Sequence, residues 1–356
     1  MLKIASEHKI NSVYLMLGQQ CNFRCKYCIQ CEMKENIDSL HLSRRAREYI
    51  WHLIRIRPEC EPKLRLVFWG GEPLLYFKLI QELVSEFKDT VSYWTVSNGS
   101  LLTQEIVDYF NLHKIGISLS YDGINTKITR GIDITEKEGF LELFNSLKLR
   151  AIDSVISAYN CDYMSLFENC KAKFGDIYIA CEFLNVTWDM PKNLYSFDLN
   201  KYRNSLKIAG LVAYRDIIEG RISNYTKLFV PTLERICSLS DTETFNFIPN
   251  CNRYYRSLSM DLIGNIYGCH NCNDIVSNVS EDRINGEKKY QMWVRERFNP
   301  VCCDCEFLRL CKGSCPLGLN TNNGKYMCQA YKLFYQTCID LAKNLNNYSE
   351  PVDFEV

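Results

Sequence analysis

Short apolar runs alternate with amphipathic stretches through the first half of the chain. In one such stretch, which begins at Tyr76, apolar residues recur at helical spacing, and Thr103 stands where a side-chain cap would begin another helix. The apolar runs have the length of buried strands, and there are six of them: SVYLML from Ser12, LRLVFW from Leu64, VSYWTVS from Val91, KIGISLS from Lys114, IDSVIS from Ile152 and DIYIACEFL from Asp176.

Six strand–helix alternations predict parallel βαβ units. We therefore expect an α/β fold whose first part is a partial (β/α)6 barrel of the TIM type. A doubly wound sheet is the alternative, because periodicity does not determine whether a sheet closes.

The pattern changes near residue 185. Residues 200–240 are typical of helix, residues 250–328 are loop-rich, and a last helix is expected over 326–345. We expect three parts: the barrel over 1–190, a helical connection over 191–245, and a small cysteine-rich domain with the last helix over 246–356.

The charge balance and the length of the apolar runs argue against nucleic-acid-binding, membrane and secreted proteins. The 356 residues include 42 basic and 42 acidic side chains, whereas a non-specific nucleic-acid binder needs a basic excess. No apolar run reaches the roughly 18 residues of a membrane span, and the first residues lack the apolar segment of a signal peptide. We therefore expect no nucleic-acid or membrane partner and a cytoplasmic location.

The chain has 19 cysteines, an odd number. Disulfides are rare in a reducing compartment, so clustered cysteines predict metal ligands. Cys21, Cys25 and Cys28 have the spacing C-x3-C-x2-C directly after the first expected strand, at the end where active sites of α/β barrels form. Three thiolates can hold three irons of a 4Fe–4S cluster and leave the fourth open. A structural zinc site needs four ligands, for which Cys31 is a candidate.

Polar motifs follow the next three strands. Two glycines that allow a close approach, Gly70 and Gly71, come before Glu72, which can bind an ammonium group, and Pro73. Ser97 and Asn98 end the third strand and can bind ribose hydroxyls, although Asn-Gly is also a common turn. Asp122, in the sequence SYDG, and Arg130 follow the fourth strand, where charged residues are most often solvated.

These motifs, in this order, resemble the radical S-adenosylmethionine (radical SAM) enzymes over roughly residues 10–185. The resemblance implies that the open iron binds SAM and that Gly70, Gly71 and Glu72 hold its methionine end. It places Ser97 and Asn98 at the ribose, Tyr27 by the adenine, and Arg130 at the carboxylate or ribose. It also makes Pro73 and Asp122 candidate contacts of the cofactor. An external donor of the flavodoxin or ferredoxin type would supply the electron that cleaves SAM to a 5′-deoxyadenosyl radical. That radical would take a hydrogen atom from the substrate.

A second group of cysteines has the spacing C-x12-G-x4-C, then C-x2-C-x5-C-x3-C, then one further cysteine. This group resembles the SPASM domain, which follows the radical SAM domain in enzymes that modify peptides and proteins. The resemblance implies two auxiliary 4Fe–4S clusters, and three clusters in all. Its ligands would be Cys251, Cys269 and Cys315 for the first auxiliary cluster, and Cys302, Cys305, Cys311 and Cys328 for the second. The fourth ligand of the first is Cys237, Cys272 or an open position.

The resemblance implies modification of a peptide or protein by a cross-link, a thioether or an oxidation, as in the maturation of ribosomally made peptides. In the enzymes of anaerobic sulfatase maturation, an Asp follows the cysteine that corresponds to Cys269. Here His270 occupies that position, which counts against that reaction. Only 20 residues precede Cys21, too few for a leader-binding domain, so a small molecule or free amino acid is the alternative substrate. A zinc-binding interaction module is a remote alternative. No catalytic base or hydrogen donor is singled out.

Overall fold

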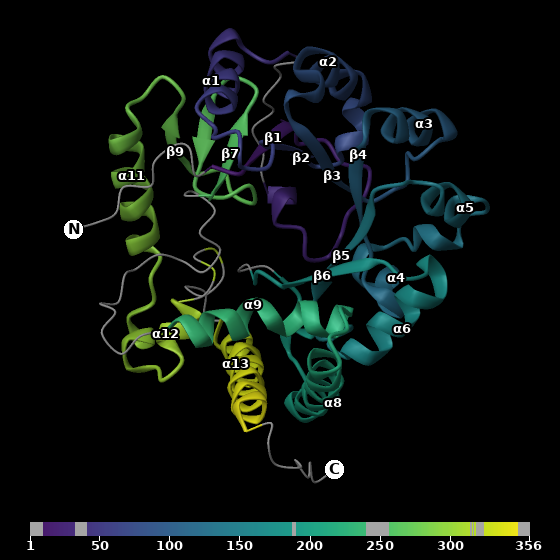
Figure 1. The fold of residues 1–356 in the computed structure, drawn as a ribbon, viewed down its shortest axis with the longest axis vertical. Helices are drawn as coiled ribbons and strands as arrows, with labels where there is room; N and C mark the ends of the chain where they lie inside the picture. Colours follow the sequence, from purple (N-terminus) through teal and green to yellow (C-terminus); the bar gives the residue numbers. More distant parts are fainter. Residues whose placement is uncertain are drawn as a thin grey trace. The chain divides into compact units, whose positions relative to one another are not determined.

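The computed structural model describes residues 10–32, 41–186, 190–239, 256–313, 315, 317 and 324–347 (Figure 1). The chain divides into two compact units. The first contains the described residues of Met1–Tyr121, Thr126–Asp153 and Cys251–Arg297, and the second contains those of Asp122–Asn125, Ser154–Asn250 and Phe298–Val356. Each unit is therefore assembled from separate stretches of chain, and the expected boundaries at 190 and 245 stay predictions.

All six expected strands are present. They are β1 (Ser12–Gly18), β2 (Arg65–Gly70), β3 (Ser92–Ser97), β4 (Ile115–Ser120), β5 (Arg150–Ile156) and, in the second unit, β6 (Tyr178–Phe183). In the first unit β1 to β5 pair in parallel and follow each other in chain order. A doubly wound sheet would reverse that order at a switch point. The open parallel sheet therefore confirms the α/β fold with a partial barrel.

Helices connect the parallel strands on one side of the sheet. Figure 1 shows α1, α2, α3 and α5 on the same side of β1 to β4, as right-handed connections require. In α2 the residues Ile80, Leu83, Val84 and Phe87 are buried, as their helical spacing predicts. Thr103 caps α3 by accepting a hydrogen bond from the Ile106 backbone N–H. The bounds of the helices in this unit are α1 Arg44–Arg55, α2 Phe77–Phe87, α3 Gln104–His113, α4 Thr126–Arg130, α5 Phe140–Asn145 and α11 Arg283–Glu296, with short 3-10 turns η2 Ile29–Glu32, η3 Pro73–Tyr76, η4 Lys88–Thr90 and η6 Ile134–Glu136.

Three further strands extend the sheet beyond β1: β7 (Ser257–Asp261), β8 (Asn265–Tyr267) and β9 (Ile275–Asn278). β7 pairs with β1 in parallel, and β8 and β9 continue the sheet in antiparallel pairs. The sequence predicted loops here, because runs of three to five residues are too short to show a strand period.

Asp261 organises the turn between β7 and β8. Its carboxylate is fully buried and accepts hydrogen bonds from the backbone N–H groups of Ile263, Gly264 and Asn265, at 2.9 to 3.1 Å. It also accepts from the Asn265 amide and the Tyr267 hydroxyl, at 3.0 and 2.8 Å. Five donors thus meet one buried carboxylate, and the hairpin depends on it.

The second unit is mostly helical. The bounds of its helices and 3-10 turns are η5 Gly123–Asn125, α6 Tyr163–Phe174, α7 Lys192–Tyr195, α8 Leu199–Ile218, α9 Asn224–Ser238, η7 Pro300–Asp304, α12 Leu308–Cys311 and α13 Gly324–Asn346. The last helix and the helices over 200–240 agree with the prediction. Ser223 and Thr226 form a capping box at the start of α9, and Pro231 lies inside this helix.

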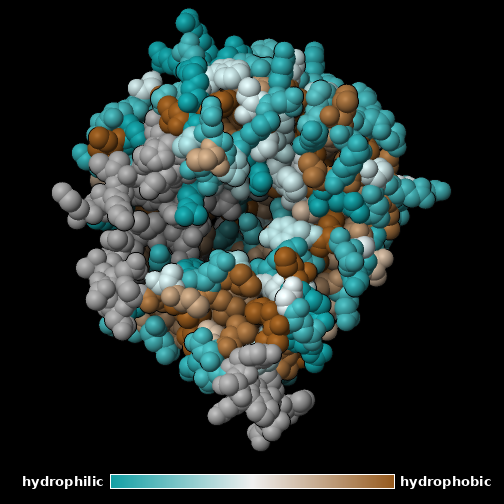
Figure 2. All heavy atoms as spheres, viewed as in Figure 1, coloured by the Kyte–Doolittle hydropathy of each residue, from teal (hydrophilic) through white to brown (hydrophobic). Residues whose placement is uncertain are grey.

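Apolar side chains gather over the region of α9 and α13 in Figure 2. Within this unit Phe229 of α9 stacks on Phe334 of α13. No helix among the residues described here has the length and apolar character needed to cross a bilayer.

We predict that Asp261→Ala destabilises the first unit by about 2–4 kcal/mol, because it leaves buried donors without an acceptor. Chemical denaturation of the purified protein measures this change. Asp282→Ala is the control, since Asp282 begins α11 without a side-chain capping bond and is exposed. Equal stability of the two variants would contradict the role given to Asp261.

Candidate functional site

The first three cysteines share one loop that begins where β1 ends. Cys21, Cys25 and Cys28 are all partly exposed. The Cys28 backbone N–H donates to the Cys25 carbonyl at 3.1 Å and so closes a turn. The Phe23 backbone N–H donates to the Cys21 sulfur at 3.4 Å. The loop thus presents three thiols at the carboxyl end of the first strand, as the sequence predicts.

Gly70 and Gly71 pack against the start of this loop. A Cβ on Gly70 would lie 2.2 Å from the Gly18 carbonyl oxygen, and one on Gly71 would lie 2.3 Å from the Gln20 carbonyl oxygen. The backbone N–H groups of Gly71 and Glu72 donate to those same two carbonyls, at 3.0 and 2.8 Å. The sequence predicts glycines here for close approach to a ligand. The structure adds a requirement within the protein, because any side chain would push the cysteine loop away.

Glu72 joins the second strand end to the third. Its carboxylate is 1% exposed and accepts from the Leu74 backbone N–H at 3.0 Å, the Ser97 hydroxyl at 2.7 Å and the Asn98 backbone N–H at 2.8 Å. Burial raises the pKa of Glu72, and the hydrogen bonds from Asn98, Leu74 and Ser97 partly offset that rise. Pro73, the next residue, is buried and opens η3. The sequence placed both motifs at strand ends but did not predict this contact.

Asn22, which sequence reasoning missed, ties the cysteine loop to the same turn. The Asn98 side-chain amide donates to Asn22 at 2.9 Å, and the Asn22 amide donates to the Ser100 hydroxyl at 2.8 Å. Ser100 in turn donates to the Asn98 side-chain oxygen through its hydroxyl and its backbone N–H. The only signal in the sequence is an amide side chain between two cysteines of the first cluster, which is too common to single out.

Tyr27 and Arg130 are brought together. The Arg130 guanidinium lies over the Tyr27 ring at 5.3 Å, and both side chains are largely buried. The neighbouring Lys26 backbone N–H donates to the Thr129 carbonyl at 2.9 Å, which fixes the cysteine loop to α4. Asp122 belongs to the second unit, where it is fully buried and accepts from the Val155 backbone N–H at 3.1 Å.

Cys269 and Cys272 share a turn after β8 in the first unit. The Cys272 backbone N–H and thiol both donate to the Cys269 carbonyl, at 3.2 and 3.4 Å, and burial raises the pKa of Cys272 to about 12. The Asn271 backbone N–H donates to the Cys269 sulfur at 3.5 Å.

His270, between these two cysteines, is 2% exposed. It stacks on Tyr14 and meets Trp69 edge-on, with ring centroids 4.7 and 4.3 Å apart. Its ring therefore packs between the side chains of two neighbouring strands of the barrel.

The other predicted ligands belong to the second unit or lie outside the residues that the structure describes. Cys251 lies outside the described residues. Cys315 is partly buried, and Cys237, on α9, is exposed. Among the cysteines that the structure describes, none forms a disulfide.

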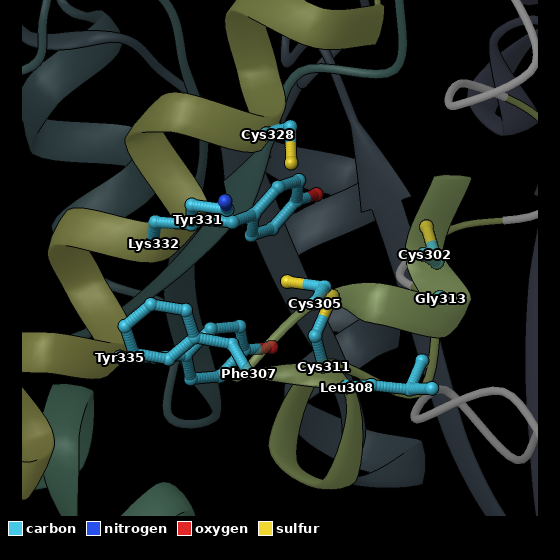
Figure 3. A pocket seen from close by; sticks show the side chains of 10 residues that line it. All are labelled: Cys302, Cys305, Phe307, Leu308, Cys311, Gly313, Cys328, Tyr331, Lys332 and Tyr335. Atoms are coloured by element: carbon cyan, nitrogen blue, oxygen red, sulfur yellow. The ribbon is translucent and has the colours of Figure 1, made fainter. Parts of the chain in front are cut away.

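Four cysteines line one hollow in the second unit (Figure 3). Cys302 is in η7 and Cys305 directly follows it, Cys311 ends α12, and Cys328 is on α13. In Figure 3 the sulfurs of Cys305 and Cys328 point toward the same space from different elements. The hollow holds about 340 Å³, part of it open to solvent, and its wall includes Phe307, Leu308, Gly313, Tyr331, Lys332 and Tyr335.

The thiols of this hollow affect one another. Burial raises the pKa of Cys302, and the neighbouring thiols of Cys328 and Cys305 add to that effect. Over the described ranges, no three His, Cys, Asp or Glu side chains converge as ligands of one metal ion would. In a 4Fe–4S cluster each thiolate binds a different iron, so its ligands surround a volume. Four thiols around a partly enclosed apolar hollow fit such a group.

A family model described as a 4Fe-4S single cluster domain matches residues 12–131. Among curated proteins, the chain is 23% identical to the radical SAM cyclopropyl synthase TigE of Paramaledivibacter caminithermalis, over 97% of this chain and 77% of that protein. It is also 23% identical to the cysteine-type anaerobic sulfatase-maturating enzyme of Clostridium perfringens, over 92% of this chain and 95% of that protein. A GTP 3′,8-cyclase of Campylobacter lari is 25% identical over 72% of this chain and 80% of that protein.

Solved structures share the fold. The structure titled native anSMEcpe with bound AdoMet and Cp18Cys peptide matches with a TM-score of 0.66 and 21% identity, over 95% of this chain and 99% of that one. Streptococcus suis SuiB bound to its precursor peptide SuiA matches with a TM-score of 0.59 and 16% identity, over 89% and 76%. The matched 4Fe-4S model, the radical SAM relatives and the shared fold agree with the geometry of the loops, and the chain is a radical SAM enzyme of the SPASM type.

Proposed function

We propose that this enzyme uses SAM to modify a side chain of a peptide or protein. The observation that carries the proposal is the joined set of loops at the strand ends, in which Glu72 and Asn22 tie the cysteine loop to the turns after β2 and β3. Relatives whose names or structure titles include sulfatase maturation or a bound peptide support a peptide substrate.

In this proposal Cys21, Cys25 and Cys28 hold a 4Fe–4S cluster with one open iron. When bound, that cluster supplies the electron that cleaves SAM and so generates a 5′-deoxyadenosyl radical. The protein's own residues orient SAM and exclude water around it. The turn Gly70–Pro73 receives the methionine end, and Ser97 and Asn98 receive the ribose.

Glu72 suits an ammonium group for a physical reason. A carboxylate offers roughly four acceptor positions, and hydrogen bonds from Leu74, Ser97 and Asn98 occupy three of them. One position is left for the amino group of SAM. Tyr27 and Arg130, packed together, offer an apolar face and a cation for the adenine and the carboxylate or ribose, and Asp122 stays a candidate contact.

Two auxiliary clusters complete the proposal, which gives three clusters in all. Cys302, Cys305, Cys311 and Cys328 would hold one of them, and the hollow that these residues line supports this assignment. Cys251, Cys269 and Cys315 would hold the other. Cys272 shares the turn of Cys269, which favours it over Cys237 as the fourth ligand. A flavodoxin- or ferredoxin-type protein would supply electrons.

A small-molecule substrate is the second candidate, because a GTP 3′,8-cyclase is among the relatives. The two candidates are separated by incubating the reduced enzyme with SAM and either short peptides encoded near its gene or nucleotides and free amino acids. Faster formation of 5′-deoxyadenosine with one class, together with a mass change in that compound, identifies the substrate. Zinc in place of iron in anaerobically purified protein would instead favour the zinc-binding module.

We predict that Cys25→Ala abolishes 5′-deoxyadenosine formation and removes roughly four irons per chain. Iron and sulfide analysis and a dithionite-driven cleavage assay on anaerobically reconstituted protein measure both effects. Cys60→Ala is the matched control, since Cys60 is an exposed cysteine outside every ligand group. Cleavage that survives in Cys25→Ala would overturn the assignment of this loop.

We also predict that Glu72→Gln weakens SAM binding about 5- to 150-fold with unchanged iron content. The neutral amide loses the charge-assisted hydrogen bond to the amino group of SAM, and loss of such a bond costs roughly 1–3 kcal/mol. Equilibrium dialysis of reconstituted protein measures the affinity, and Glu142→Gln, at an exposed position on α5, is the control. Wild-type affinity in Glu72→Gln would mean that the carboxylate does not support the SAM site.

A further inference from the structure

The hollow lined by Cys302, Cys305, Cys311 and Cys328 also has a positively charged side chain in its wall. This side chain, Lys332, is not one of the proposed cluster ligands. Ten described residues line it, and among these Lys332 alone carries a positive charge. Figure 3 shows the Lys332 side chain beside Tyr331, one turn of α13 after Cys328. An i, i+4 pair lies on one face of a helix, so the spacing of Cys328 and Lys332 directs both toward the same side.

The other non-cysteine residues that line the hollow are uncharged. They are aromatic, aliphatic or glycine: Phe307, Leu308, Gly313, Tyr331 and Tyr335. Phe307 and Tyr331 each stack on Tyr335, which makes one side of the hollow a continuous aromatic surface. A charge beside low-dielectric walls acts more strongly than the same charge surrounded by water.

Lys332 lines the same hollow as the four thiols, so its positive charge attracts any negative charge placed among them. Reduction of a 4Fe–4S cluster adds one negative charge, and the net charge around a cluster is one of the factors that set its potential.

We propose that Lys332 raises the reduction potential of the auxiliary cluster held by Cys302, Cys305, Cys311 and Cys328, so that this cluster accepts an electron more readily than its ligands alone would allow. The inference rests on the proposed function, because it requires a cluster in this hollow. Lys332 binds no iron in this proposal and acts only through its charge. It is a positioning residue on α13, the helix that supplies the ligand Cys328, and its positive charge acts on the cluster from there.

The test is a redox titration followed by electron paramagnetic resonance. The protein carries Cys25→Ala so that the SAM-binding cluster is absent and only auxiliary clusters respond. Lys332→Met should lower the midpoint of one transition and leave the other in place, with roughly a tenfold smaller ratio of reduced to oxidised cluster at a fixed potential, which is about 59 mV for one electron. Lys332 is exposed, so the difference should shrink at high ionic strength.

Two further variants separate charge from structure. Lys332→Arg keeps the charge and should keep the wild-type midpoint. Lys343→Met removes a lysine from the exposed part of the same helix, eleven positions further along, and should change nothing. If Lys332→Met loses iron, Lys332→Gln takes its place. Loss of iron in both neutral variants, with full iron in Lys332→Arg, would also support the charge, because four thiolates then need the cation to stay together.

The proposal is wrong if Lys332→Met or Lys332→Gln keeps its iron and titrates like the parent protein. If instead no cluster is bound in this hollow, a different result is expected. In that case Cys305→Ala, with Lys332 intact, would lose no iron and no signal.

Discussion

A buried carboxylate that must remain surrounded by donors holds the strand ends of this enzyme together. Glu72 follows β2, and its partners come from the turn after β3 and from its own η3. Leaving such a group without partners in a low-dielectric site is costly, so the donors and the carboxylate stabilise one arrangement of the loops. Through Asn98 and Asn22 the same network reaches the cysteine loop. The positions of three thiols relative to the turns after β2 and β3 therefore depend on one acidic side chain.

Much of the fold follows from local patterns, and the exceptions have physical causes. The six apolar runs, the Thr103 cap and the last helix were predictable, because strand runs, caps and helical periodicity depend on neighbouring residues. β7 to β9 were missed because they are short and rely on pairing with β1, whose sequence is far away. The contact of Gly71 with Gln20 and the bond from Ser97 to Glu72 are likewise tertiary. Motifs predict residue types at strand ends, whereas the bonds between motifs require the fold.

The two kinds of cysteine group pose different problems for the chain. Cys21, Cys25 and Cys28 are close in sequence, so little conformational entropy is lost when they meet. The hollow of the second unit brings Cys302, Cys305 and Cys311 to Cys328 from three different elements. In the proposed function, a cluster bound there would couple to the docking of α13, and part of its binding free energy would stabilise the unit itself.

The parallel pairing of β1 with β7 has a consequence for the synthesis of the protein. The hydroxyl groups of Ser12 and Ser257 lie 2.9 Å apart, although 245 positions separate them in the chain. At a ribosomal rate of about 5–20 residues per second, β1 emerges roughly 10–50 seconds before its partner. During that interval one edge of β1 has unpaired backbone groups, directly before a loop of oxidisable thiols. Nascent chains of this enzyme therefore carry an open strand edge beside exposed thiols until the last part of the sheet has been synthesised.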